Sequence, residues 1–589
     1  MPSFYVRHEY LFVFLTYFVF SLVQAVWALP IYEDTDCYTH ALRVIEFLQN
    51  GTWKETVFPY YNHPFGDVSV FTRFLDVVWS LCALPFLFSM DLKNAVYYGG
   101  YVMQTCLTVA SAVGIVWAVK PFLHSALFRL TSVVFYFLQI GTVALYFLNR
   151  PDHHAPLNLL LILLCGFLFR YFADGRNKKA LTAAGVLGGL CVWNCIEGFL
   201  IFYIVLAGVG IVWLLGGIKL KALRRVSTAA ALTVTAAWLA NPPFYGWFYP
   251  DRNRISVFYA AIALITAAVF AAGEGLSRKF SWSRKKEIFS VLAMAAAGIG
   301  FFILLFGAET VFAPVYSKEL VREWAVYIGE LKPVPLKRFF TGVNLLYPAM
   351  TAFSLFFCLR RSGPERNACV VVLTAVLATM LLTLRASRFF RDYGVFCTFL
   401  VMFVFSAVKL PAKKSPVWGA AFALGVFMFV LYKGLSIPAF NKDAVFRLAA
   451  KYLPPPSGSV LSSSSDTPAI VWHTGYKGIG APYHSNEEGI LDTARMLNEP
   501  YDEKTKELLI KHDVRLILIN WPNFLDSFLS LPQEEKDEML DKSMKEVSEH
   551  FVLRLLRGKI KECGIKPYPL PPDFAYVLTA YTVDFSECP

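Results

Sequence analysis

Residues 33–40 of the chain, with the sequence EDTDCYTH, directly follow the first long apolar run, which extends from Tyr10 to Leu29. This run is long enough to cross a bilayer, so the carboxylates of Glu33, Asp34 and Asp36 are expected at a membrane surface. Acidic groups packed this closely repel one another unless a cation lies between them. The stretch by itself also fits a solvated loop beside the helix, and only the rest of the chain separates the two interpretations.

The composition indicates a polytopic membrane protein. Of the 589 residues, 56% are hydrophobic and only 17% are charged, whereas soluble domains carry about 25% charged residues. The formal net charge of +12 comes from short Lys and Arg clusters between apolar runs, as the positive-inside rule predicts, and no nucleic-acid partner is expected. The first apolar run lacks a small-residue cleavage site, so we expect a retained helix rather than a signal peptide.

About thirteen apolar runs are long enough to span a bilayer, some of them short and tilted. They lie near residues 10–29, 95–118, 130–148, 156–172, 180–194, 198–216, 227–242, 255–273, 288–307, 338–358, 368–384, 394–409 and 417–435. Basic clusters fall on alternate connections, which predicts that those loops are cytoplasmic. The remaining loops are predicted to face outward: 30–94, 149–155, 243–254, 308–337, 385–393 and everything after about residue 436.

Two regions outside these runs have an organisation of their own. The first outer loop, 30–94, contains the apolar stretch Val77 to Phe88, which predicts an interfacial or re-entrant helix that walls a cavity. After about residue 440, strand-like pieces (459–461, 469–472 and 514–519) alternate with helical ones (488–498, 503–511 and 534–550), which predicts a small α/β domain. We therefore divide the chain into a transmembrane domain, 1–438, and an extracytoplasmic domain, 439–589. Cys563 and Cys588 in the latter fit either a disulfide or two thiols.

Four polar clusters on the predicted outer face are candidates for one site. They are Asp34 with Asp36, the run Asp152-His153-His154, Glu330, and Arg388 with Arg391. An Asp-x-His spacing, met by an Asp from another loop, predicts a divalent-cation site in which the oxygens favour Mg²⁺ or Mn²⁺ and the His keeps Zn²⁺ open. Each cluster alone also fits a polar turn or, for the Arg residues, a side chain that reaches from the membrane to the surface.

The order of these motifs resembles that of the catalytic subunit of oligosaccharyltransferase and its bacterial and archaeal single-subunit counterparts, which are GT-C glycosyltransferases. Asp34-Thr35-Asp36 is similar to the family's first-loop DxD, Asp152-His153-His154 to its second acidic motif, and 327–333 to the loop with its tethering Glu. The segment 388–393 resembles the family's Arg-bearing segment. The chain departs from the family at the WWDYG element, where it has four Ser residues, 462–465, and Asp466. Recognition of an Asn-x-Ser/Thr acceptor is therefore in question.

The resemblance implies a GT-C fold with about thirteen helices and a C-terminal outer domain. It also implies metal-dependent transfer of a glycan from a polyprenyl phosphate or pyrophosphate donor to a protein or glycolipid acceptor. The implied residues are Asp36, Asp152 and His154 for the cation, Asp36 and Glu330 for catalysis, and Arg388, Arg391, Asp34 and His63 for donor phosphate or acceptor binding. We expect a single-subunit integral membrane enzyme, of the inner membrane if bacterial, with its active site on the extracytoplasmic face.

Two other functions stay open at this point. A GT-C transferase that moves a single sugar from a polyprenyl phosphate to a glycolipid, polysaccharide or protein hydroxyl would share these clusters and differ in its donor. A flippase or transporter of lipid-linked glycans would also have many spans, but it is expected to show inverted repeats or helices broken near the midplane. Neither feature is evident in the sequence. Glu197, beside Trp193 and Asn194, is more typical of a capping or surface carboxylate than of a site residue.

Overall fold

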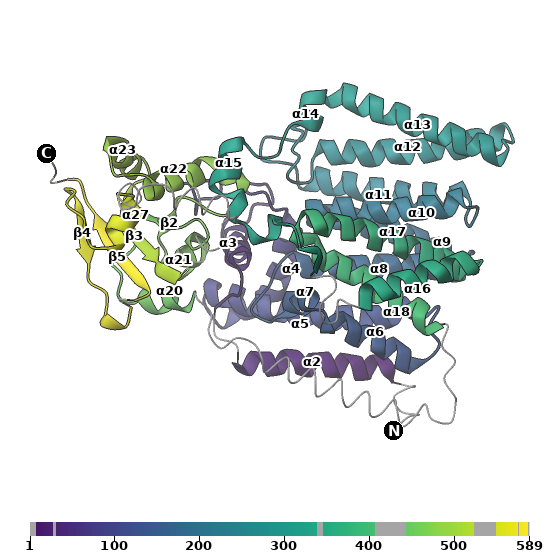
Figure 1. The fold of residues 1–589 in the computed structure, drawn as a ribbon, viewed down its shortest axis with the longest axis horizontal. Coiled ribbons are helices and arrows are strands. Elements are labelled where there is room, and N and C mark those ends of the chain that lie inside the picture. Colours follow the sequence, from purple (N-terminus) through teal and green to yellow (C-terminus); the bar gives the residue numbers. More distant parts are fainter. Residues whose placement is uncertain are drawn as a thin grey trace.

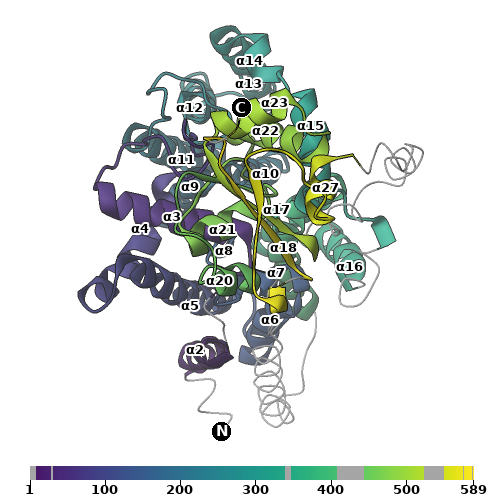
Figure 2. The same cartoon turned by 90° about the vertical axis from the view of Figure 1, so that its left-hand side faces the viewer.

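The computed structural model describes residues 8–27, 31–337, 346–406, 443–522, 549–574, 576–586 and 588. Long helices lie side by side in one part of the molecule, and a smaller unit with a β-sheet lies at one end of them (Figure 1). Viewed along the helices, this unit covers the middle of the bundle's end (Figure 2). The predicted architecture of a helical domain followed by a small α/β unit is confirmed. The predicted domain division at 438 and 439 lies outside the described residues and stays a prediction.

Twelve of the thirteen predicted spans overlap helices of the described residues. These are α2 (Glu9–Trp27), α5 (Leu92–Val119), α6 (Ala126–Leu138), α8 (His154–Ala173), α9 (Lys178–Asn194), α10 (Ile196–Leu214), α11 (Leu220–Ala240), α12 (Val257–Lys279), α13 (Arg284–Phe306), α16 (Leu346–Arg360), α17 (Pro364–Arg385) and α18 (Phe390–Ser406). The thirteenth, 417–435, lies outside the described residues. Within the described ranges, eight helices are long and apolar enough to cross a membrane.

The predicted span 130–148 is interrupted. α6 ends at Leu138, Gln139 takes an extended backbone, and the chain continues through the short α7 (Ile140–Val143) and η2 (Ala144–Tyr146). The Gln139 side-chain amide donates a hydrogen bond to Thr398 Oγ1 on α18 at 2.9 Å. A buried amide requires such a partner. Because the partner is 259 residues away, the local apolar pattern could not indicate the interruption.

The first outer loop contains α3 (Thr35–Asn50), α4 (Arg73–Ala83) and the 3₁₀ turn η1 (Leu84–Phe88). α3 begins after Asp34, whose side chain accepts a hydrogen bond from the Asp36 N–H, and it ends at Gly51, which has a left-handed φ of 62°. Both features are common at helix ends. The acidic stretch is therefore the start of a helix. α4 and η1 cover the predicted helix 77–88, whose depth in the membrane stays a prediction.

The C-terminal unit contains a five-stranded sheet in the order β2-β1-β3-β5-β4. Its strands are β1 (Ser459–Leu461), β2 (Lys477–Gly478), β3 (Val514–Asn520), β4 (Ile565–Tyr568) and β5 (Leu578–Val583). β1 is parallel to β2 and β3, whereas β5 is antiparallel to β3 and β4. The helices of the unit are α20 (Ala444–Ala449), α21 (Thr467–Thr474), α22 (Glu487–Asn498), α23 (Glu503–Lys511) and α27 (Phe551–Leu556). The predicted strands at 459–461 and 514–519 and the helices at 488–498 and 503–511 are confirmed.

The predicted strand at 469–472 is wrong, because these residues lie in α21. Pro468 occupies the first turn of that helix, and Gly475 ends it with a φ of 82°. Pro at the start and Gly just past the end favour a helix, and these end signals outweigh the β-branched residues between them. The predicted helix 534–550 falls almost entirely outside the described residues. Cys563 and Cys588 form a disulfide, which decides between the two states that the sequence left open.

Backbone hydrogen bonds join the C-terminal unit to the first outer loop. The N–H groups of Asn62 and His63 donate to the carbonyls of Ile479 and Gly478 at 3.0 and 3.1 Å, and the Gly478 N–H donates to the Tyr60 carbonyl at 2.8 Å. Main-chain pairing of this kind fixes the distance and register between two segments. The sheet unit is thus held against the loop that contains α3.

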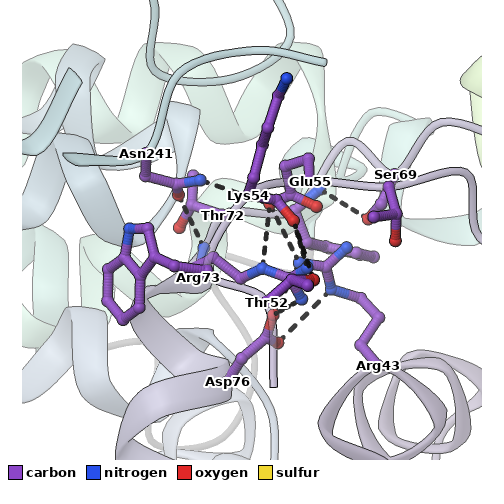
Figure 3. Close-up of polar contacts among 12 residues, drawn as sticks. Arg43, Thr52, Lys54, Glu55, Ser69, Thr72, Arg73, Asp76 and Asn241 are labelled. Carbon is purple, nitrogen blue, oxygen red and sulfur yellow. Dashed lines mark hydrogen bonds and ion pairs between the residues drawn. The ribbon is translucent and has the colours of Figure 1, made fainter. Parts of the chain in front are cut away.

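A buried network of ion pairs holds the first outer loop together (Figure 3). Asp76 on α4 accepts hydrogen bonds from Arg43 at 2.7 Å and from Arg73 at 3.0 Å. Glu55 accepts from Arg254 at 3.0 Å and lies 3.5 Å from both Arg43 and Arg73. The three Arg side chains and Asp76 are at most 1% exposed. Buried charges persist only where they are paired and hydrogen-bonded, so the network constrains α3, α4 and the connecting loop together.

We expect Asp76→Asn to destabilise the protein strongly. The substitution keeps the shape of the side chain and leaves two buried guanidinium groups short of a negative partner, a loss worth about 3–5 kcal/mol. The check is the melting temperature of the purified protein in detergent. Glu323→Gln, which removes an exposed pair with Arg322, is the control and should leave the melting temperature almost unchanged. Equal melting temperatures for the two variants would contradict the role of the network.

Candidate active site

Asp36 lies in the first turn of α3. This helix lies where the helical bundle meets the C-terminal unit (Figure 1). Asp36 Oδ1 accepts a hydrogen bond from the Tyr483 hydroxyl at 2.8 Å. Tyr483 is 7% exposed, and its ring packs against Phe71 and Tyr61 of the first outer loop. The C-terminal unit therefore orients this carboxylate from a position 447 residues further along the chain.

Asp152 and His153, just before α8, form a compact group with His40 of α3. The distance between Asp152 Oδ1 and His153 Nδ1 is 2.7 Å, and His40 Nε2 lies 3.1 Å from His153 Nδ1. His40 Nε2 is 3.8 Å from Asp152 Oδ1. All three side chains are buried, and their ligand atoms lie within 4.8 Å of one another, close enough to share a metal ion.

The predicted metal ligands Asp36, Asp152 and His154 are neighbours, although they are not among the groups whose ligand atoms gather within 4.8 Å. Asp36 lies close enough to Asp152 for the negative charge of Asp152 to raise the pKa of Asp36. The His154 ring packs on the His153 ring at a centroid distance of 4.2 Å. It is His153 that pairs directly with Asp152, so the assignment of His154 as a ligand stays a prediction.

The protons of this group are distributed unequally. Loss of solvent, together with the charges of Asp34 and Asp152, raises the pKa of Asp36 from 3.8 to about 7. Burial acts against the Asp152 carboxylate, but the neighbouring His153 and His154 hold the pKa of Asp152 well below its usual value. Burial would also lower the pKa of His153, yet Asp152 raises it to about 9. At neutral pH Asp152 and His153 therefore form an ion pair, while Asp36 is close to its midpoint.

Two arginines, one in the turn before α18 and one in the first turn of α18, pair with carboxylates from other parts of the chain. Arg388, in η7 (Ser387–Phe389), pairs with Glu197 on α10, and Arg391 pairs with Glu330 in η4 (Gly329–Leu331). Two hydrogen bonds from Ser387, to the carbonyls of Lys332 and Gly329 at 2.8 and 2.9 Å, hold the two segments together. Arg388 Nε and Arg391 Nη1 are among the buried polar atoms, within the described residues, that have no hydrogen-bond partner.

Two of the predicted contacts to donor or acceptor are engaged elsewhere in the structure. Asp34 caps α3 and pairs with Arg150. The His63 ring lies 3.9 Å from Asp513, and its backbone carbonyl is 2.7 Å from His512 Nδ1. His63 therefore contacts the C-terminal unit beside the loop pairing described above. Binding of a donor or acceptor by either residue stays a prediction.

The sequence motifs did not predict roles at the site for His40, His153 or Tyr483. For Glu197 they favoured a capping or surface carboxylate. A signal for His40 was available, because residues four apart on a helix share one face, and His40 is four residues after Asp36. His153 lies inside a motif that the sequence analysis had already singled out. No local pattern indicates Tyr483, whose contact to Asp36 exists only because the C-terminal unit folds back onto the first loop.

The group fits a divalent cation chemically. Within the described residues, His40 Nδ1 is a buried polar atom without a hydrogen-bond partner, and the buried Asp152 Oδ1 lies 2.7 Å from His153 Nδ1 and 3.8 Å from His40 Nε2. A buried polar atom left unpaired is costly, and a cation among these groups would also balance the carboxylate charge. Carboxylate oxygens with one or two imidazoles are a common donor set for divalent metals.

We expect the affinity for a divalent cation to fall as the pH drops through about 7. Below that pH the Asp36 carboxyl carries a proton, which must leave before the oxygen can bind a metal. The groups that face Asp36 are Asp34, Asp152 and Glu330, which raise its pKa, and His153, which lowers it. Calorimetric Mn²⁺ titrations at pH 6 and 8 measure the effect, and Asp36→Asn should remove most of it. An affinity independent of pH, or the same dependence in Asp36→Asn, would contradict this assignment.

Comparison with known proteins supports the fold. No protein-family model matches the sequence, and no curated protein matches it. Among solved structures, the oligosaccharyltransferase AglB of Archaeoglobus fulgidus, in complex with an inhibitory peptide and a dolichol-phosphate, superposes with a TM-score of 0.71 at 13% identity, over 97% of this chain and 81% of that one. The same organism's enzyme tethered to a peptide with an NVT sequon (TM-score 0.67, 14% identity, 98% and 81% covered) and with Zn and sulfate (TM-score 0.67, 12% identity, 95% and 80% covered) is similar too. The chain thus has the fold of an archaeal oligosaccharyltransferase.

Proposed function

We propose that the protein is a membrane glycosyltransferase that transfers a glycan from a polyprenyl phosphate or pyrophosphate donor to an acceptor, with the help of a divalent cation. The observation that carries this proposal is that His153, the partner of Asp152, lies within 4.8 Å of Glu197, the partner of Arg388, in a chain with an oligosaccharyltransferase fold. The candidate cation ligands and the arginine segment therefore adjoin. Acidic ligands for a cation beside guanidinium groups for phosphate are what such a reaction needs.

The solved neighbours support the choice of ligands. The archaeal enzyme binds a dolichol-phosphate and an inhibitory peptide in one structure, and Zn and sulfate in another. We extend the same classes of ligand to this chain, namely a lipid-linked phosphate donor and a peptide or protein acceptor. Each CH₂ group of a lipid chain buried in the membrane contributes about 0.8 kcal/mol to membrane retention. The lipid would therefore hold the donor in the membrane, and the polar site would need to contact only the phosphate and the acceptor.

The cation would be held by Asp36, Asp152 and His154, with His153 and His40 as the imidazoles nearest to Asp152. Oxygen ligands favour Mg²⁺ or Mn²⁺, and the imidazoles also suit Zn²⁺. When bound, the ion would neutralise negative charge that develops on the leaving phosphate oxygens. In its absence the site keeps charge balance by protonation, since Asp36 has a pKa of about 7 and can hold or release a proton near neutral pH.

Glu330 would orient the acceptor, and the two arginines would bind the donor phosphate. A guanidinium group binds two phosphate oxygens at once, so an entering phosphate can replace Glu330 as the partner of Arg391. Glu330 is then free to orient the acceptor, and its carboxylate can take up the acceptor's proton. Arg388 remains paired with Glu197 until a second anionic group arrives. Through this exchange of partners, donor binding would release the Glu330 carboxylate from Arg391 and make it available to the acceptor.

The acceptor and the side of the membrane are part of the same proposal. In place of a Trp pair the chain has a serine run, in which Ser463 Oγ donates to Asp466 Oδ2 at 2.8 Å, so we propose an acceptor other than the usual sequon.

The Cys563–Cys588 disulfide supports an oxidising compartment for the C-terminal unit. The active site adjoins that unit and would face the same, extracytoplasmic, side.

Asp36→Ala and Asp152→Ala should each abolish metal-dependent glycan transfer while the protein stays folded. Each removes a cation ligand, and a loss of at least about a hundredfold in kcat is expected where a transition-state charge loses its partner. The assay uses purified protein with a lipid-linked glycan, and the melting temperature reports folding. Glu319→Ala, an exposed carboxylate on the outer α15 (Lys318–Glu323), is the matched control. Unchanged turnover in either variant would contradict the site.

Glu330→Gln should lower kcat with a smaller effect on donor affinity. The amide cannot take up a proton, but the neighbouring Arg391 remains available for phosphate. Donor binding by calorimetry and single-turnover transfer separate the two effects. Equal losses in both would refute the role assigned to Glu330.

A donor exchange tests the class of reaction. Purified protein supplied with a pyrophosphate-linked oligosaccharide should transfer it, and mass spectrometry of the acceptor gives the mass added. Transfer only from a monophosphate-linked sugar would assign the chain to the single-sugar GT-C transferases instead.

A further inference from the structure

We propose that His153, Cys195 and Glu197 form a second cation site, which adjoins the Asp36 and Asp152 site and shares His153 with the group around Asp152, for an ion that accepts a thiolate, such as Zn²⁺. One ligand atom from each of these residues lies within 4.8 Å of the other two. Cys195 is 9% exposed, and His153 is 4% exposed. The existence of this site does not depend on the proposed transfer reaction.

Two segments deliver the ligands. His153 immediately precedes α8, whereas Cys195 and Glu197 lie two residues apart where α9 passes into α10. Cys195 has an extended backbone and separates two helices that would otherwise be continuous. The His153 segment and the Cys195 segment are brought together only in the folded state.

The nitrogen of His153 that is left for this site is Nε2. Its Nδ1 already contacts Asp152 at 2.7 Å and His40 at 3.1 Å. A carboxylate that accepts from one imidazole nitrogen, while the other nitrogen binds a metal, is the usual arrangement at zinc sites, because the hydrogen bond fixes the ring and its tautomer. Asp152 would thus contribute to both sites. It would be a ligand of one, and in the other it would be the hydrogen-bond partner that orients His153.

Asn194 completes the surroundings of the thiol. Its Nδ2 donates to the His153 carbonyl at 2.9 Å and lies 3.4 Å from Cys195 Sγ. Its Oδ1 is one of the buried atoms of the described chain that lack a hydrogen-bond partner, and the residue is 4% exposed. Asn194 therefore joins the His153 segment to the Cys195 segment and contacts the sulfur. At metal sites, residues that surround the ligands commonly orient them by such hydrogen bonds.

The donor set distinguishes the two sites by metal. Sulfur, nitrogen and one carboxylate oxygen suit Zn²⁺, whereas a carboxylate-rich site suits Mg²⁺ or Mn²⁺. On binding, the Cys195 thiol and the Nε2–H group of protonated His153 each release a proton to solvent, and the thiolate and the neutral imidazole coordinate the ion. Three protein ligands leave one position of a tetrahedral zinc open.

A cation at this site would affect Arg388. Glu197 is the carboxylate that pairs with Arg388, and a positive ion bound to Glu197 competes for the same negative charge. The guanidinium group would then be released for another anion. The second site thereby offers a way to adjust the Arg388 segment without a change at Asp36.

Cobalt spectroscopy tests the proposal on the full-length protein. The purified protein in detergent is stripped with a chelator and titrated with Co²⁺, and a thiolate-to-cobalt charge-transfer band should appear in the near ultraviolet. Zn²⁺ should bleach the band. Cys195→Ser should remove it, and so should Glu197→Gln, which provides a second variant if Cys195→Ser fails to fold.

Two controls separate this site from its surroundings. Cys191→Ser changes another buried thiol, on α9 and outside the ligand group, and should keep the band. Asp36→Ala should also keep it while losing glycan transfer, so failure of the proposed function and failure of the thiolate site give different results. Absence of the band in the wild-type protein, or its persistence in folded Cys195→Ser, would overturn the proposal.

Discussion

The buried ion network of the first outer loop is the constraint on which the candidate site depends. Arg43, Arg73 and Arg254 balance the carboxylates of Glu46, Glu55 and Asp76. Charges withdrawn from water lose a large solvation energy unless each has a partner in good geometry, so the loop can adopt few other arrangements. Arg43 lies on α3, the helix that also carries Asp36 and His40. The network therefore sets the position of the acidic end of that helix relative to the bundle.

The C-terminal unit makes the second essential contact with α3. Tyr483 donates to Asp36, the Tyr38 ring contacts the His473 ring at a centroid distance of 5.5 Å, and residues 60–63 pair with 478–479 through the backbone. A site built in this way from several segments is complete only when both units are folded and docked. This explains how a residue of the C-terminal unit can orient the Asp36 carboxylate.

The sequence predicted the helical part well because a long apolar run has few alternatives in a membrane. Every backbone polar group must be satisfied within the segment, which makes run length a reliable guide to the helices at 92–119, 154–173 and 257–279. One error occurs where a distant residue decides, because Gln139 interrupts a predicted span and contacts Thr398, 259 residues away. The other error has a local cause, since Pro468 and Gly475 define the ends of a helix at the strand predicted for 469–472.

The sequence by itself determined that the chain is a membrane protein, which polar clusters lie between which helices, and the motif order that resembles oligosaccharyltransferase. These follow from composition, run length and residue order, which are local properties. Only the tertiary structure decided which atoms meet: that His153 rather than His154 pairs with Asp152, that His40 and Tyr483 join the site, and that Glu197 faces Arg388. Apart from the Asp152–His153 pair, these contacts join residues more than a hundred positions apart. They depend on how the helices pack, and no local pattern encodes that packing.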